Sequence, residues 1–168
     1  MRLKTTVIGI LVVLFAPAPL LAGDFYGLGL YYGGAIPEGY PLWHHSDGKG
    51  WRYFSVCPSC GWYLTERMSV KIEGELGLYD YHETDQEWLV GGSVVGAYDI
   101  LKAPGRSLFF EGGGGPNFLD GDLVWSVKAG AGVAVKDLRI SYRFMHHSKL
   151  GYDDGGYNSH GIFVEWRF

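Results

Sequence analysis

Hydrophobic and polar residues alternate along most of the chain after Gly23, and this alternation returns in several separate segments. The clearest one lies between Met68 and Leu78, where every even position is apolar or glycine. The odd positions of the same segment include Lys71, Glu73 and Glu75. A period of two is typical of a β-strand with one apolar and one polar face.

Eight segments have this period, and clusters of Gly, Pro, Asp or Asn separate them. They predict strands over residues 25–33, 51–57, 68–79, 88–98, 107–115, 123–135, 138–148 and 160–168. No segment after Gly23 has the period of a helix. The sequence therefore predicts an all-β protein.

Charges of both signs share the polar face of several strands, which suits the lumen of a transmembrane barrel better than the surface of a soluble one. Such a barrel turns its apolar face to lipid, and eight strands are the smallest even number known to close it. The chain also ends on Phe168 within a strand, a pattern typical of bacterial outer-membrane barrels. We predict an eight-stranded antiparallel transmembrane β-barrel, multi-pass in the bacterial outer membrane. A soluble lipocalin-like lipid carrier is the alternative, and it would turn the apolar faces inward.

The N-terminus has the features of a secretory signal peptide. An apolar run over residues 7–22 follows Arg2 and Lys4 and ends on the small residue Ala22. We predict a signal peptide over residues 1–22 and one barrel domain over residues 23–168.

Composition and charge narrow the function classes. The chain of 168 residues is 47% hydrophobic, 16% aromatic and 19% charged, which excludes intrinsic disorder. Without Arg2 and Lys4, 12 basic residues remain against 18 acidic ones, a net charge of −6. A nucleic-acid partner would require an excess of basic residues, so none is predicted.

Connection lengths predict which end of the barrel faces outside. With a periplasmic N-terminus, residues 34–50, 80–87, 116–122 and 149–159 become external loops, and Lys136-Asp137 becomes a short periplasmic turn. The segment 58–67 is long for a periplasmic turn. Cys57 and Cys60 lie beside it, and in an exported chain a local disulfide between them is expected.

One group of residues has no structural explanation. By the parity of the strand 138–148, His147 points into the lumen, whereas His146 and Ser148 point toward lipid. Two residues apart on one face, an imidazole can act as general base on a serine hydroxyl. Ser148 lies ten residues beyond Leu138, which corresponds to roughly 25 Å at about 40° of tilt, near the outer interface.

The C-terminal segment resembles the PagL family of outer-membrane lipid A 3-O-deacylases. The residues that match its pattern are Arg143, His146, Ser148, Gly151, Asn158, Gly161, Ile162 and Phe168. The resemblance implies an eight-stranded barrel whose Ser148 and His146 face the membrane. It further implies a serine esterase that removes the 3-O-linked acyl chain of lipid A in lipopolysaccharide, with no cofactor and no metal.

Two departures from the family pattern affect the expected site. The family has a triad acid early in the last strand, where the outward positions here are His160 and Ile162. The acids left to orient His146 are Asp153 and Asp154 in the preceding loop and Glu165, whose parity is inward. Lys149 replaces the family's asparagine after the serine, where it would contact the oxyanion or a substrate phosphate.

The missing acid keeps a second function open, a non-catalytic outer-membrane barrel, structural or adhesive, derived from the same family. The loop over residues 35–51, rich in Trp and Tyr, would then bind a partner. His44-His45-Ser46 repeats the tripeptide of the candidate site within that loop. The sequence leaves open which acyl chain is removed and whether the barrel forms a homodimer.

Overall fold

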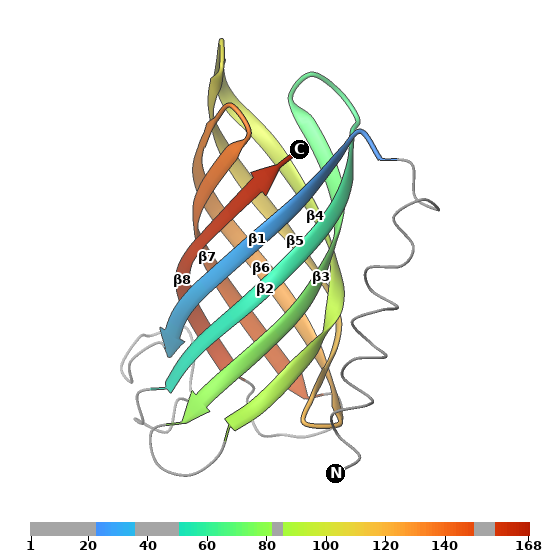
Figure 1. The fold of residues 1–168 in the computed structure, drawn as a ribbon, viewed down its shortest axis with the longest axis vertical. Coiled ribbons are helices and arrows are strands. Elements are labelled where there is room, and N and C mark those ends of the chain that lie inside the picture. Colours follow the sequence, from blue (N-terminus) through green and yellow to red (C-terminus); the bar gives the residue numbers. More distant parts are fainter. Residues whose placement is uncertain (1–22, 36–50, 82–85, 150–156) are drawn as a thin grey trace.

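The computed structural model describes residues 23–35, 51–81, 86–149 and 157–168, which form a closed antiparallel barrel (Figure 1). Each strand pairs with its neighbours in the chain, and the first strand also pairs with the last. The strands are β1 (Phe25–Ala35), β2 (Trp51–Tyr63), β3 (Met68–Tyr81), β4 (Gln86–Ala103), β5 (Arg106–Leu119), β6 (Asp122–Val135), β7 (Leu138–Lys149) and β8 (Tyr157–Arg167). No helix in these described ranges is long and apolar enough to cross a membrane.

The direction of the two strand faces confirms the transmembrane prediction. The charged residues Lys71, Glu73 and Glu75 of β3 are buried in the lumen, whereas Ile72 between them is 43% exposed on the outside. The other strands share this arrangement, with large apolar side chains exposed on the outer face. A soluble barrel would bury these side chains, and only a lipid environment makes their exposure favourable.

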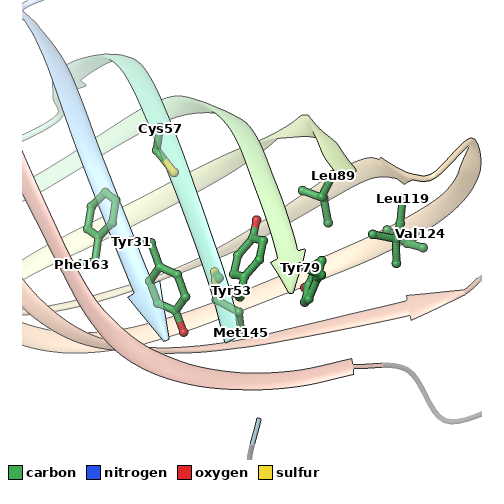
Figure 2. Close-up of a cluster of buried hydrophobic side chains, with 9 residues drawn as sticks. All are labelled: Tyr31, Tyr53, Cys57, Tyr79, Leu89, Leu119, Val124, Met145 and Phe163. Atoms are coloured by element: carbon green, nitrogen blue, oxygen red, sulfur yellow. The ribbon is translucent and has the colours of Figure 1, made fainter. Parts of the chain in front are cut away.

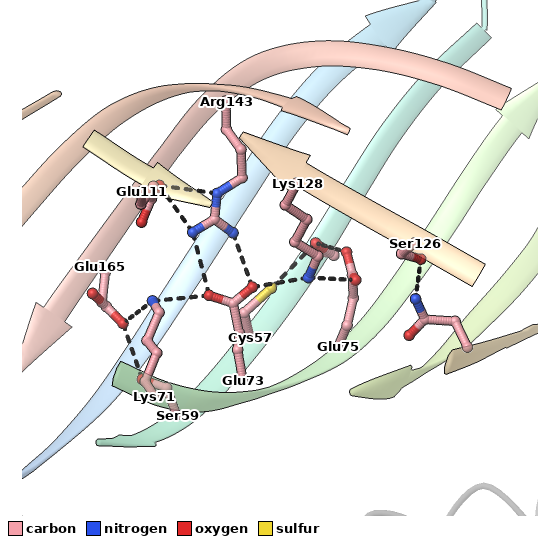
Figure 3. Close-up of polar contacts among 12 residues, drawn as sticks. Cys57, Ser59, Lys71, Glu73, Glu75, Glu111, Ser126, Lys128, Arg143 and Glu165 are labelled. Atoms are coloured by element: carbon pink, nitrogen blue, oxygen red, sulfur yellow. Dashed lines mark hydrogen bonds and ion pairs between the residues drawn. The ribbon is translucent and has the colours of Figure 1, made fainter. Parts of the chain in front are cut away.

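Ion pairs fill the middle of the lumen (Figure 3). The Glu73 carboxylate lies 2.9 Å from each of the cationic groups of Lys71, Lys128 and Arg143. Arg143 also pairs with Glu111 at 3.0 Å. Because a buried charge without a partner costs several kcal/mol, these mutual contacts are what allow so many charges inside the barrel.

Aromatic and aliphatic side chains fill the lumen toward the end of the barrel where β1 ends and β2 begins (Figure 2). The rings of Tyr53 and Tyr79 stack at 4.3 Å, and the Tyr53 hydroxyl donates to Glu75 at 2.6 Å. The barrel is narrow enough to require glycine beside such rings. A Cβ on Gly77 would lie 2.2 Å from the Tyr53 hydroxyl oxygen, so no larger residue fits there without a shift.

Several predicted strand boundaries are wrong. β4 continues to Ala103 instead of ending at residue 98, and the ends of β2 and β5 also differ. β2 continues to Tyr63, which reduces the periplasmic connection to residues 64–67, and β5 continues to Leu119, which reduces the loop 116–122 to a turn at Asp120-Gly121. Both segments contain a proline, which signals a turn in sequence. Here Pro58 and Pro116 lie within strands, and pairing with the neighbouring strands continues on both sides of them.

The expected disulfide is also wrong. Cys57 and Cys60 are both free thiols of β2, and Cys57 is buried in the lumen. Residues three apart on an extended strand point to opposite faces, about 10 Å apart along the chain. That separation exceeds the Cα distance of about 7 Å that a disulfide can bridge.

The predicted topology agrees with the described turns. The turns that follow β2, β4 and β6 lie at the same end of the barrel as the C-terminus (Figure 1). We call this the periplasmic end, because short turns are typical of it. The end of β7 and the start of β8 lie at the opposite, external end. The predicted signal peptide, residues 1–22, lies outside the described residues and stays a prediction.

Candidate active site

The period of two in β7 places its last residues on the faces that the sequence predicts. His146 and Ser148 lie on the outer face near the external end, and His147 is fully buried in the lumen. The His147 Nδ1 atom is 2.5 Å from the Ser126 hydroxyl oxygen. His147 therefore has a structural position, and its two neighbours remain the candidates for chemistry.

Aromatic residues indicate the depth of this site. Ser148 lies opposite Trp125 of β6, which is 44% exposed on the outer face. Trp88 and Phe118 are exposed in the same way near the external ends of β4 and β5. Aromatic girdles of this kind lie at the level where lipid headgroups meet hydrocarbon. Ser148 thus lies at the level of this aromatic girdle.

The His146 imidazole is oriented by an amide. Its Nδ1 atom lies 2.7 Å from Oδ1 of Asn158, the residue opposite it on β8. An amide oxygen only accepts hydrogen bonds, so Nδ1 carries the proton and Nε2 is the basic nitrogen. Asn158 is 5% exposed, which protects this bond from water. The imidazole is held in the tautomer that a general base requires.

Among the described residues, the Ser148 hydroxyl has one long hydrogen bond. Its oxygen donates to the Trp125 carbonyl oxygen at 3.4 Å. Side chains two residues apart on one strand face have Cβ atoms roughly 6–7 Å apart. This spacing lets the hydroxyl turn toward the His146 imidazole once the weak bond to Trp125 breaks. Catalytic hydrogen bonds commonly tighten in this way when substrate binds.

The structure does not bring Glu165 to the imidazole. Glu165 is buried in the lumen, 2.5 Å from Lys71 Nζ and 3.1 Å from Arg167 Nε. It cannot orient His146, because the two side chains lie on opposite faces of the sheet. Asp153 and Asp154 lie outside the described residues. Lys149 is the last residue of β7, and its side chain also lies outside what the structure describes.

Asn158 matches the family pattern in the sequence, but sequence reasoning gave it no part in the candidate site, and its contact with His146 appears only in the structure. The last strand was predicted to begin at His160, whereas β8 begins at Tyr157 and so includes Asn158. Its parity with His160 would have placed it on the outer face, at the position where an orienting group is needed. The signal was present, but the late strand boundary left this residue in a loop.

A second polar pair lies nearby on the same outer surface. Tyr142 Oη and His160 Nδ1 are hydrogen-bonded, and the two rings are 5.8 Å apart. The polar atoms satisfy each other, which lowers the cost of facing hydrocarbon. Together with Asn158 and His146, they form a polar patch on otherwise apolar strands β7 and β8.

Comparison with known proteins supports the fold. No family model and no curated protein matches this sequence. The structure is similar to that of the outer membrane enzyme PagL, with a TM-score of 0.61 and 15% identity over 83% of this chain and 98% of that chain. The chain has the fold of an outer-membrane β-barrel.

A second barrel is also similar to the chain. Ail, the attachment invasion locus protein of Yersinia pestis, has a TM-score of 0.52 and 13% identity over 87% of this chain and 99% of that chain. One outer-membrane barrel of this fold is thus an enzyme and another is an attachment invasion locus protein. At these identities the likeness extends to the fold alone, and function has to be argued from the site.

Proposed function

We propose that the protein is a serine esterase of the outer membrane that removes the 3-O-linked acyl chain of lipid A. One observation carries this proposal: Asn158 orients His146 on the lipid-facing surface, with Ser148 two residues away at the external aromatic girdle. A lipid ester in the outer leaflet reaches this surface directly. The resemblance of residues 143–168 to lipid A 3-O-deacylases supports the choice of lipid.

The residues supply both halves of an acyl transfer. The Ser148 oxygen attacks the ester carbonyl carbon while His146 Nε2 takes the hydroxyl proton. The bond to the sugar oxygen then breaks, and His146 returns the proton to that oxygen. Water, activated by the same nitrogen, hydrolyses the acyl-serine and releases a fatty acid. No cofactor or metal is needed for either half.

The uncharged amide of Asn158 should limit the turnover rate of such an enzyme. An amide fixes the tautomer and the ring orientation, but it lacks the negative charge with which a carboxylate stabilises the imidazolium. We therefore expect slower turnover than a site with a carboxylate would give. Asp153 and Asp154 stay candidates for adding that charge, and Lys149 for contacting the oxyanion or a lipid A phosphate.

The same amide favours the second candidate function, a non-catalytic barrel with a structural or adhesive role. A residue without charge at the orienting position is what a former enzyme would retain after losing its acid. The two functions differ in one measurable property, the acylation of lipid A.

The test is mass spectrometry of lipid A from cells that express the wild-type protein, Ser148→Ala or the control Ser93→Ala. Ser93 is buried in the lumen, so its loss should leave catalysis unchanged. We expect loss of one 3-O-linked acyl chain with the wild type and with Ser93→Ala, but not with Ser148→Ala. Fully acylated lipid A in cells with the assembled wild-type barrel would favour the non-catalytic function.

A further inference from the structure

Two polar side chains, Tyr142 and His160, face lipid on the same two strands as the candidate active site. Tyr142 lies on β7 and is 54% exposed, and His160 lies on β8 opposite Phe144. The apolar residues Ile140 and Ile162 surround the pair on the same outer face. Polar and ionisable groups in the hydrocarbon layer are energetically costly, and they are by default candidates for function.

The hydrogen bond between Tyr142 Oη and His160 Nδ1 uses only part of what these two groups can form. A phenol and a neutral imidazole together have two protons to donate and two atoms that accept. One bond between them leaves one donor and one acceptor, whichever group donates. Among the described residues, neither side chain has a second hydrogen bond. A hydroxyl group both donates and accepts, so it complements what the pair leaves unused.

The depth of the pair matches the first carbons of an acyl chain whose ester lies at the active site. His146 and Ser148 would act on an ester between them. His160 lies about three residues closer to the periplasmic end, which corresponds to roughly 8 Å at about 40° of tilt. A hydroxyl on the third carbon of the chain is three bonds from the ester carbon, and a hydrogen bond adds about 3 Å. Such a hydroxyl comes within reach of the pair, whereas an ordinary phospholipid chain has no polar atom at this depth.

We infer that Tyr142 and His160 bind the hydroxyl of a 3-hydroxyacyl chain and so select lipids that carry such chains. The inference rests on the proposed function, because it places the ester of the bound lipid between Ser148 and His146. The pair determines specificity and takes no part in the reaction, since it lies below the reacting atoms. A lipid without the hydroxyl leaves one donor and one acceptor facing hydrocarbon, so it binds less tightly.

The first test measures binding without catalysis. Folded Ser148→Ala barrels in detergent micelles receive equal amounts of two diacylated glucosamine 1-phosphates that differ only in the 3-hydroxyl of their acyl chains. Native mass spectrometry then compares the amounts of the two lipids retained. We expect about 3- to 10-fold more of the hydroxylated lipid, the effect of one neutral hydrogen bond. Equal retention would overturn the inference, whether or not the wild type hydrolyses either lipid.

Further substitutions in the same background assign the preference to the pair. Tyr142→Phe and His160→Leu should each bring the two lipids close to equal retention. Both barrels should fold normally, because each change replaces a polar group that faces hydrocarbon with an apolar one. The matched control is Tyr32→Phe, a lipid-facing tyrosine of β1 opposite Ile162, which should keep the preference. A preference that survives both Tyr142→Phe and His160→Leu would contradict the assignment.

Hydrolysis by the wild type separates this inference from the proposed function. We expect cleavage of both lipids, with kcat/KM about 3- to 10-fold higher for the hydroxylated one. Cleavage of neither lipid, with the binding preference intact, would contradict the esterase and keep the hydroxyl site. Cleavage of both lipids at equal kcat/KM, with equal retention, would contradict the hydroxyl site and keep the esterase.

Discussion

β7 carries two neighbouring histidines in opposite environments. His147 faces the lumen, and its Nδ1 atom lies 2.5 Å from the hydroxyl oxygen of Ser126. His146 faces lipid, is oriented by Asn158, and has Ser148 two residues away. The lumen pair has the better contact but no access to substrate, because His147 and Ser126 are both fully buried. A serine beside a histidine becomes a catalytic site only where a substrate can reach it.

The largest effect should come from exchanging the two histidines for alanine separately. His146→Ala should abolish deacylation of lipid A, as should Ser148→Ala, because base and nucleophile act as one unit. His147→Ala should retain most of the activity. The measurement is release of fatty acid by the purified barrel in detergent–lipid A micelles. Loss of activity in His147→Ala, with normal folding, would show that the faces have been assigned incorrectly.

Ion pairs hold the charged side chains in the lumen. Glu73 lies at the centre of this ion-pair network. Glu73→Ala should lower the free energy of unfolding by about 3–5 kcal/mol, because three buried cations lose a partner. The urea dependence of the electrophoretic shift between folded and unfolded barrel measures this loss. A matched change outside the lumen, Glu66→Ala in the β2–β3 turn, should have little effect. Similar stability of both variants would contradict a structural role for the ion pairs.

In the lumen the removal of a charge should destabilise the barrel, whereas on the outer surface the addition of a charge should do so. Ile72→Arg, in the middle of β3 and facing lipid, should cost about 2–4 kcal/mol of stability and impair assembly. The control is Glu66→Arg in the exposed β2–β3 turn, where the new side chain stays in water and the barrel should fold normally. Assembly in membranes, followed by the shift in electrophoretic mobility on heating, distinguishes the two. Normal assembly of Ile72→Arg would place this face away from lipid.

The smallest of the expected effects is the change in kcat when Asn158, the residue opposite the outward His146, is replaced. Asn158→Leu should lower kcat by about 10- to 100-fold, the value of one hydrogen bond to a group that becomes charged, about 1.5–3 kcal/mol. Asn158→Asp should raise kcat above wild type, because a carboxylate also stabilises the imidazolium. KM should change little in either variant, since Asn158 acts through His146. A lower rate in Asn158→Asp than in Asn158→Leu would rule out Asn158 as the orienting group.

Sequence alone determined which way side chains point. A period of two assigns each residue of a strand to one face, so the eight strands, the charged lumen and the outward position of His146 and Ser148 were all predictable. The sequence predictions that were wrong concern the ends of strands. There Pro58 and Pro116 suggested turns that pairing with neighbouring strands overrides, and the local spacing of Cys57 and Cys60 suggested a disulfide.

The tertiary structure decided which residues lie opposite one another. That His146 lies beside Asn158, and Glu73 beside Lys128 and Arg143, depends on the register between strands. Alternation within a strand has the same phase after a shift of two residues, so it cannot select the register. Register is selected by the summed packing and ion pairing of the closed barrel, which involves residues far apart in the chain. The residue opposite His146 therefore follows only from the pairing of β7 with β8.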